Sequence, residues 1–438
     1  MTPSITKSLP RLYFWQSIAV VFGLITQVYL ARTLGPHDKG ILDLFLLIPT
    51  VLSSTTDLGL LSANTFFAGK RKYAIHTLHS NTIVWALLVV LFLIVGSIIW
   101  QHLSSLPFPS LDNKFLILSI LATGPMLYLA LWGGLMYGTD KTEAVYIIQG
   151  IGAVVLLIAY IGVVFFSASL AFAIYVTAAV IVLKAIMAAI IYFRDHSFSI
   201  APDQVVFTAS VKYGIALFVG IVINILHNRL VLFFVEGYLG PSALGLYTIS
   251  VRIVEMIWLL DYVVINASLF KLTASSLDEA IVLTTRMTRL ICCIVIIAGL
   301  IMAVTIPWLI PLLLKKEFTP SVLPALLLLP GIIAWSLGRS LAQFIAYQIG
   351  KPWYNTRVAA VAFTINIVLC ALFIPRWGIN GAALASTLSY MSMAVLMTLL
   401  FARTAHISVP AIYRIQKDDV VLLKKSLDHL WRSLRREP

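Results

Sequence analysis

The segment LGPHDKGI at residues 34–41 recurs as LGPSALGL at residues 239–246, 205 residues further along the chain. Each copy follows a long apolar stretch, residues 12–34 in the first case and 211–235 in the second. A Gly-Pro pair after such a stretch marks a tight turn, and self-similarity at a fixed distance indicates duplicated structure. The repeat therefore predicts two related blocks, each opening with an apolar segment and a tight turn.

The composition excludes a water-soluble globular domain. Of the 438 residues, 60% are hydrophobic and only 11% are charged. A membrane-spanning helix needs about 20 apolar residues, and stretches of this kind cover residues 12–34, 41–63, 83–100, 115–138, 145–166, 170–193, 211–235, 243–266, 290–314, 323–350, 358–374 and 379–401. We therefore predict an all-α polytopic membrane protein with about 12 transmembrane helices.

The repeat and the apolar stretches together predict two lobes of six helices. Because six is an even number, both lobes enter the membrane in the same orientation, as parallel repeats about an axis along the membrane normal. The predicted N-terminal lobe covers residues 1–200 and the C-terminal lobe 201–403, followed by a basic amphipathic cytoplasmic tail at 404–438. Transporters of this construction bind their substrate between the lobes.

Lysine and arginine are distributed unevenly among the predicted loops. About 21 of the 31 Lys and Arg residues lie in the N-terminus, the even-numbered loops and the tail, and about six lie in the odd-numbered loops. By the positive-inside rule both termini are cytoplasmic. The net charge is +13, and most of the cations lie in the loops on one side of the predicted membrane. We therefore predict that they contact membrane lipids and that the protein does not bind nucleic acid.

Several ionisable side chains fall inside or beside the apolar stretches. They are the cations Lys184, Arg229, Arg252 and Arg339 and the acids Asp57, Glu255 and Asp261. Such groups are costly at the bilayer centre unless they face water or a partner, so they mark a pathway. The excess of cations predicts a central cationic cavity for an anionic head group, and arginine in particular matches phosphate oxygens.

Two of these assignments have simpler alternatives. Arg252 and Glu255 are three residues apart on one helix face and could neutralise each other. Lys184 could extend its ammonium to the membrane surface. For coupling to H+ or Na+, the candidates are Asp57, Glu255 and Asp261. No other cofactor is predicted, and the three cysteines lack metal-ligand spacing, so no metal site is predicted.

Several motifs resemble those of one family. They are Leu30-Ala31-Arg32-Thr33-Leu34-Gly35-Pro36, Asp57-Leu58-Gly59-Leu60, Asn228-Arg229-Leu230, Tyr238-Leu239-Gly240-Pro241, Gly350-Lys351-Pro352 and the long run from Ile374 to Ala385. With them the chain resembles the O-antigen and capsule unit flippases, the Wzx-type polysaccharide exporters of the multidrug/oligosaccharidyl-lipid/polysaccharide exporter superfamily. That superfamily also holds multidrug-and-toxin extruders and lipid II flippases.

The resemblance implies a two-lobed protein of the bacterial cytoplasmic (inner) membrane. Such a protein moves an undecaprenyl-pyrophosphate-linked glycan to the outer leaflet and works beside polysaccharide polymerase and export proteins. Arg229 falls on the family's helix-seven arginine, and Arg32 in the first motif joins the candidate substrate-binding residues. The chain departs from many relatives at Val231, where they have Asp, and at Asp261 and Lys271, where they have Pro. The resemblance therefore lends no support to a coupling-ion site.

The expected mechanism is alternating access with no covalent step, so the chain is not predicted to be an enzyme. Prolines predicted to break or kink the helices, which would help the lobes to rock, are Pro49, Pro125, Pro307, Pro311 and Pro330. A multidrug-and-toxin extruder-like antiporter is the first alternative, although its organic cations would not suit a cationic cavity. A membrane glycan polymerase or ligase is the second, and the longest predicted outward loop, 101–114, is short for one.

Overall fold

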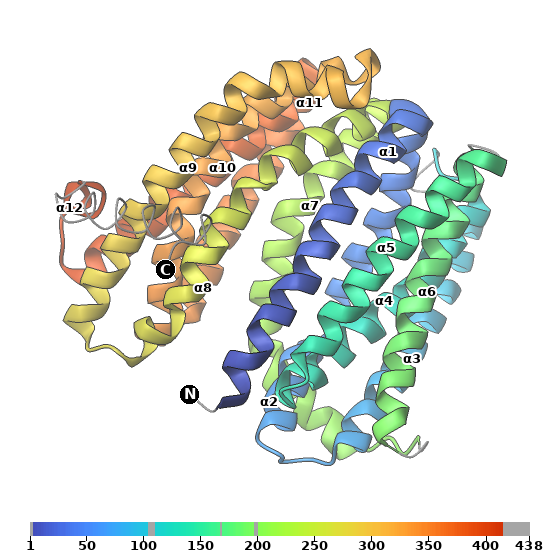
Figure 1. Ribbon diagram of the computed structural model, residues 1–438, viewed down its shortest axis with the longest axis horizontal. Helices are drawn as coiled ribbons and strands as arrows, with labels where there is room; N and C mark the ends of the chain where they lie inside the picture. Colours follow the sequence, from blue (N-terminus) through green and yellow to red (C-terminus); the bar gives the residue numbers. More distant parts are fainter. Residues whose placement is uncertain (1–2, 104–109, 167–168, 197–199, 415–438) are drawn as a thin grey trace, which may run out of the picture. The chain divides into compact units, whose positions relative to one another are not determined.

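The regular elements are helical throughout the part of the chain that the computed structural model describes, residues 3–103, 110–166, 169–196 and 200–414. They are α1 (Pro3–Thr55), α2 (Leu60–Gly69), α3 (Ile75–Leu103), α4 (Asn113–Gly138), α5 (Thr142–Phe166), α6 (Leu170–Asp195), α7 (Gln204–Glu255), α8 (Ile257–Ala274), α9 (Leu277–Leu314), α10 (Val322–Gln343), α11 (Pro352–Ala405) and α12 (Val409–Tyr413) (Figure 1). The predicted all-α fold is confirmed. Most of the predicted tail, residues 415–438, lies outside the described residues.

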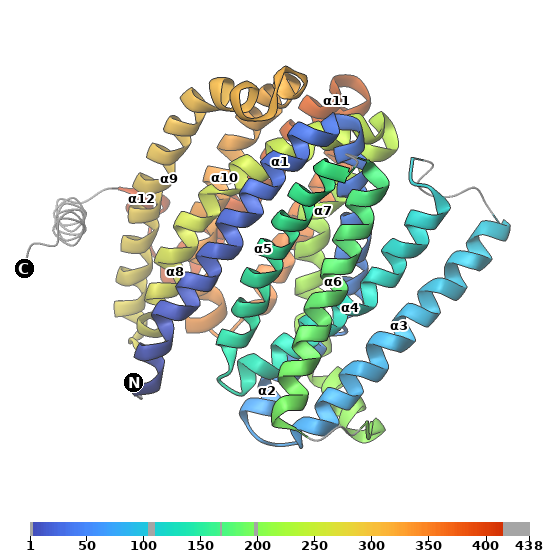
Figure 2. The same ribbon diagram turned by 45° about the vertical axis from the view of Figure 1, so that its right-hand side comes forward.

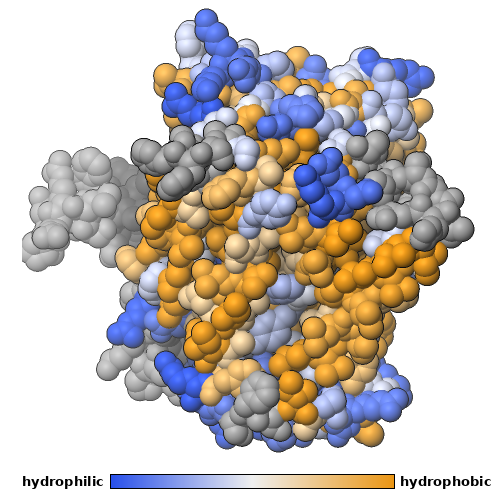
Figure 3. All heavy atoms as spheres, turned by 90° about the vertical axis from the view of Figure 1, so that its right-hand side faces the viewer, coloured by the Kyte–Doolittle hydropathy of each residue, from blue (hydrophilic) through white to orange (hydrophobic). Residues whose placement is uncertain are grey.

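Many of the helices are long and apolar, and they expose large apolar side chains. Within the described ranges, nine are long and apolar enough to cross a membrane. Phe92 on α3 and Trp308 on α9 are 76% and 78% exposed, which water would penalise and hydrocarbon does not. Figure 3 shows the face on which α3 and α6 stand, where mostly apolar side chains lie between two hydrophilic ends. The protein is therefore a multi-pass membrane protein.

Three of the membrane-crossing helices are long enough for two crossings. Their candidate spans are Phe14–Thr55 with 42 residues, Leu217–Tyr262 with 46 and Pro352–Ala405 with 54, where one crossing takes about 20. Each span contains one glycine with non-helical dihedral angles. The nine helices are thus compatible with the predicted twelve crossings, a number that stays a prediction.

The breaks in α1 and α7 fall on the two copies of the repeat. Gly35 has φ 73° and ψ 175°, and Gly240 has φ 79° and ψ −179°. These angles belong to a region of backbone space that is open almost only to glycine. In α11 the break is at Gly378, with φ 58° and ψ −140°. The helices are not broken at the prolines: α4 continues through Pro125, and the same holds for the other prolines singled out in the sequence.

By internal contacts the chain forms two compact units. Unit 1 is Met1–Leu246 with Leu313–Phe318, and unit 2 is Tyr247–Leu312 with Thr319–Pro438. The predicted lobes are defined by the repeat rather than by packing, so their boundaries at residues 200 and 403 stay a prediction.

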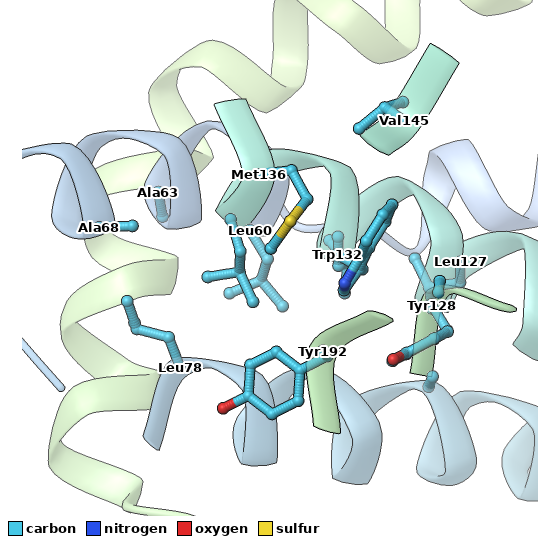
Figure 4. Close-up of a cluster of buried hydrophobic side chains, with 14 of the residues drawn as sticks. Leu60, Ala63, Ala68, Leu78, Leu127, Tyr128, Trp132, Met136, Val145 and Tyr192 are labelled. Atoms are coloured by element: carbon cyan, nitrogen blue, oxygen red, sulfur yellow. The ribbon is translucent and has the colours of Figure 1, made fainter. Parts of the chain in front are cut away.

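In unit 1, α4 is the central helix and packs against α1, α2, α3, α5 and α6. Figures 1 and 2 both show α5 and α6 running side by side. The core between these helices consists of large apolar side chains, among them Leu60, Leu127, Leu131, Trp132, Met136 and Tyr192 (Figure 4). Glycines let α4 approach α2 closely: a Cβ on Gly134 would lie 2.5 Å from the Leu61 carbonyl oxygen.

The two copies of the repeat pack against each other inside unit 1. A Cβ on Gly40 would lie 1.7 Å from the carbonyl oxygen of Pro241, and a Cβ on Gly245 would lie 2.1 Å from that of Pro36. Gly40 and Gly245 occupy the same place in the two motifs. The contact is therefore reciprocal, and only glycine allows the backbones to come so near.

Unit 2 is built around α10 and α11, which pack along each other, with α8 against α10 and α12 against α11. Its core contains Leu272, Leu341, Phe344, Met397 and Phe401. The rings of Phe344 and Phe401 meet edge to face, with centroids 4.9 Å apart. Arg339 lies in the last turns of α10, which packs against α8.

Candidate functional site

Lys184 lies in the middle of α6, and its side chain rests on α5. The lysine side chain can pack against α5 only because residue 152 is glycine: a Cβ at that position would lie 2.3 Å from Cε of Lys184. Among the described residues, no carboxylate forms an ion pair with this ammonium group. The alternative that Lys184 merely reaches the membrane surface gains no support from this placement, since the lysine tail is held between two helices.

A pocket in unit 1 receives the Lys184 side chain. Its volume is about 260 Å³, and it lies between α2, α4, α5 and α6. The polar lining consists of Lys184, Gln149, Tyr137 and the indole of Trp132, and the remaining walls are apolar. The pocket contains no acidic residue. Sequence reasoning placed Lys184 at bilayer depth but had no means of finding the three other polar residues among the many aromatic and amide side chains.

Arg339 and Asp261, two of the predicted site residues, form an ion pair in unit 2. Nη1 of Arg339 lies 3.2 Å from Oδ1 of Asp261, whose side chain is fully buried, while that of Arg339 is 27% exposed. The guanidinium also stands 5.4 Å from the ring centroid of Trp258, a cation–π contact. Trp258 in turn meets Tyr390 edge to face at 5.8 Å. The acid is on α8, so a search along the sequence around Arg339 misses it.

The remaining predicted residues are placed as follows. Arg32 is exposed on α1, just before the break at Gly35, and Arg229 is half-buried on α7. Arg252 is exposed and Glu255 half-buried near the end of α7, three residues apart on one helix, so the sequence-based alternative of mutual neutralisation remains open.

Asp57 has a structural task in unit 1. It is buried, and its Oδ1 accepts a hydrogen bond of 3.0 Å from the backbone N–H of Leu61. This bond satisfies one of the amides that the first turn of α2 leaves without a helical partner. Whether Asp57 also binds a coupling cation stays a prediction.

Sequence reasoning missed a second buried ion pair. Nζ of Lys39 lies 2.6 Å from Oδ2 of Asp43, and the two side chains are 0% and 5% exposed. The predicted helices end at residue 34 and resume at residue 41, which leaves Lys39 between them. In the structure the chain is helical from Pro36 onward, so Lys39 and Asp43 lie one turn apart on one helix. The spacing of four residues between opposite charges was the available signal.

Comparison with known proteins gives a family and a fold. A family model described as polysaccharide biosynthesis protein matches residues 11–270, more than half of the chain. No curated protein sequence matches the chain.

Solved structures of transporters resemble most of the chain. Lipid II flippase MurJ in an inward closed conformation aligns with a TM-score of 0.71 and 15% identity, over 94% of this chain and 91% of that one. An inward-facing MATE family multidrug resistance transporter of the MOP superfamily aligns with a TM-score of 0.69 and 11% identity, over 89% and 94%. A MOP superfamily transporter from Pyrococcus furiosus aligns with a TM-score of 0.64 and 11% identity, over 93% and 95%. At these identities the similarity shows the fold, and the family model adds the lineage: the chain is a member of the polysaccharide biosynthesis protein family with the fold of MOP superfamily transporters.

Proposed function

We propose that this protein is a flippase that moves a lipid-linked oligosaccharide from the cytoplasmic to the outer leaflet of a bacterial inner membrane. The substrate class is an undecaprenyl-pyrophosphate-linked glycan, and the mechanism is alternating access without a covalent step. The observation that carries the proposal is Lys184, a cation held at mid-helix in an acid-free pocket of a membrane protein from a polysaccharide biosynthesis family. A cation in such a place needs an anionic partner.

In this proposal the protein works by electrostatics and shape. The glycan and its diphosphate enter a central cationic cavity, while the polyprenyl tail stays in the bilayer. Arg229, Arg339, Arg252, Arg32 and Lys184 are the candidate contacts for the anionic groups. Arginine presents planar pairs of N–H donors that match two phosphate oxygens at once. Both termini are cytoplasmic in this proposal, and polysaccharide polymerase or export proteins receive the product.

The Arg339–Asp261 pair suggests how substrate and a coupling cation interact. A phosphate that binds Arg339 competes with the buried carboxylate of Asp261, which lies 3.2 Å from the guanidinium. When Arg339 turns to the substrate, Asp261 is left as a buried charge, and uptake of H+ or Na+ would stabilise it. Asp261 is therefore the strongest of the three candidates for ion coupling.

A multidrug-and-toxin extruder-like antiporter is the second candidate function. The fold similarity to MATE family transporters favours it. An organic cation would need an available acid, however, and in this chain Asp57 accepts a backbone hydrogen bond and Asp261 is paired with Arg339. The flippase proposal therefore fits the charges better.

The test is export of surface glycan in cells that carry single variants. We expect Arg229→Ala and Arg339→Ala to remain in the membrane but to block export, so that lipid-linked glycan accumulates inside. Arg376→Ala is the matched control, because Arg376 is exposed and its guanidinium donates a hydrogen bond to the carbonyl oxygen of Leu372 on its own helix. Normal export by both cavity variants would contradict the assignment, and drug sensitivity with normal glycan export would favour the extruder.

A further inference from the structure

The pocket around Lys184 is a separate small chamber within unit 1. Its volume of about 260 Å³ lies below the range of roughly 300–1,000 Å³ that holds a drug-sized ligand. It suits a single sugar ring or one small anion rather than a whole oligosaccharide. Tyr137 and Gln149 are exposed lining residues of the pocket, Tyr137 at 40%, whereas Trp132 and Val145 are buried ones.

The polar groups of the pocket call for an acceptor. The Lys184 ammonium can only donate hydrogen bonds, whereas Gln149 and Tyr137 each carry an acceptor oxygen as well as a donor. Since the lining offers the ammonium no carboxylate, a ligand that brings a negatively charged oxygen acceptor would complete the site.

The charge of the pocket limits the ligand further. Lys184 is the only charged residue in the lining of the pocket. Its ammonium neutralises one negative charge, and a second negative charge on the ligand would stay uncompensated in a medium of low dielectric constant. A diphosphate diester carries two charges and favours the paired donors of arginine. A carboxylate carries one charge, which a single lysine can match as a point charge.

We propose that this pocket binds a carboxylate-bearing sugar of the transported glycan, with Lys184 as the carboxylate partner, Gln149 as a donor to its oxygens and Trp132 as a wall of the pocket. The proposal rests on the proposed flippase function and adds to it a preference for acidic glycans. The site is distinct from the arginines proposed to meet the diphosphate.

Gly152 is part of the proposed site because it makes room for the lysine tail. A methyl group there would lie 2.3 Å from Cε of Lys184 and 3.0 Å from its Cγ and Cδ, so the flexible lysine would have to move while the backbone stays in place. Gly152→Ala should therefore weaken the site although the ammonium is still present. Gly162→Ala on the same helix is the matched control, since a Cβ at Gly162 would meet nothing within 4 Å.

The experiment measures binding of sodium glucuronate to the full-length protein purified in detergent, by calorimetry and by the shift in Tm. We expect glucuronate to bind and raise Tm, and glucose to do neither. Lys184→Met should weaken glucuronate binding by about tenfold or more, the loss typical of a charge-assisted hydrogen bond. Gly152→Ala should weaken it too, while Gly162→Ala and Lys114→Met, at an exposed lysine, should bind as the parent does.

Three results would overturn the proposal. The first is equal binding of glucuronate and glucose. The second is glucuronate binding that Lys184→Met leaves unchanged. The third is a Lys184-dependent shift caused by short-chain phosphatidylglycerol or inorganic pyrophosphate but not by glucuronate, which would assign the pocket to a phosphate instead. Because binding is measured on purified protein, its outcome is independent of the export assay. If the protein binds glucuronate but has no role in glycan export, the proposed flippase function is rejected and the proposed binding site is kept.

Discussion

Among single residues, the Arg339–Asp261 pair gives the sharpest stability prediction. Asp261 is fully buried at its side chain, so Arg339→Ala leaves a carboxylate without its partner. Removal of one member of a buried pair is strongly destabilising, and we expect a loss of about 3 kcal/mol in the free energy of unfolding. Thermal unfolding in detergent would measure it as a lowered Tm.

A double variant separates the structural role of this pair from a role in substrate binding. Arg339→Met with Asp261→Leu removes both charges and should recover most of the lost stability, because apolar replacements of a buried pair are often neutral. Export should stay blocked, since the proposed cation for the diphosphate is gone. If the double variant exports glycan normally, Arg339 has no part in the substrate site.

The sequence identified the ionisable residues of the helices but not their partners. Lys184, Arg339 and Asp261 all stand out because charge is rare in apolar segments. That Arg339 meets Asp261 depends on how α8 packs on α10, and the two residues are 78 positions apart. Likewise, Trp132 is one of ten tryptophans, and only packing shows that it lines the Lys184 pocket. Tertiary contacts of this kind leave no local pattern in one sequence.

Among the helices, the break in α7 provides a test of pure backbone strain. Gly240 has φ 79° and ψ −179°, and a Cβ there would meet no atom within 4 Å. Gly240→Ala thus adds no clash but forces a residue with a side chain into a glycine-only conformation. We expect a cost of about 1–3 kcal/mol in the free energy of unfolding, seen as a lower Tm in detergent.

Gly237→Ala is the matched control, three residues away in the same helix and equally free of neighbours within 4 Å. Here the backbone is helical, so alanine should leave the Tm unchanged or raise it slightly. Equal Tm values for the Gly237 and Gly240 variants would mean that the helix is not broken at Gly240.

The crossing of the two repeat motifs in unit 1 makes a separate prediction. A Cβ on Gly40 would lie 1.7 Å from a backbone oxygen of Pro241, which no side-chain movement can relieve. We expect Gly40→Ala to cost about 3 kcal/mol through overpacking and to lower the Tm accordingly. Gly23→Ala, also in α1 with nothing within 4 Å, should behave as the parent; a Gly40 variant as stable as this control would contradict the close crossing.

The helix pattern was largely predictable, and its failures have a physical cause. Apolar stretches of about 20 residues mark membrane helices because the bilayer sets their length. The Gly-Pro pairs at residues 35–36 and 240–241 correctly marked the breaks in α1 and α7. The turns are tighter than expected, however, so helix resumes at once and carries Lys39 and Asp43 into the interior. The prolines do not end their helices, since α4, α9 and α10 run through theirs, and a kink at these positions stays a prediction.

For the molecule as a whole, the number of membrane crossings decides whether the two termini lie on the same side of the membrane. If each of α1, α7 and α11 crosses the membrane twice, the chain has an even number of crossings and both termini lie on one side. By the positive-inside rule, the excess of Lys and Arg in alternate loops predicts that this side is the cytoplasm. Residue 72, in the loop after α2, should then be cytoplasmic, and residue 114, at the start of α4, should face outward.

Cysteine labelling tests both statements at once. In a variant without Cys292, Cys293 and Cys370, we would introduce Lys72→Cys or Lys114→Cys, both at exposed positions. A membrane-impermeant maleimide should label residue 114 in intact cells, and residue 72 only after the inner membrane is opened. We expect residue 72 to be protected in intact cells because Lys70, Arg71 and Lys72 form a cluster of positive charges, which favours the cytoplasmic side. Labelling of residue 72 from outside would invert the topology, and with it the direction in which the protein is proposed to carry its glycan.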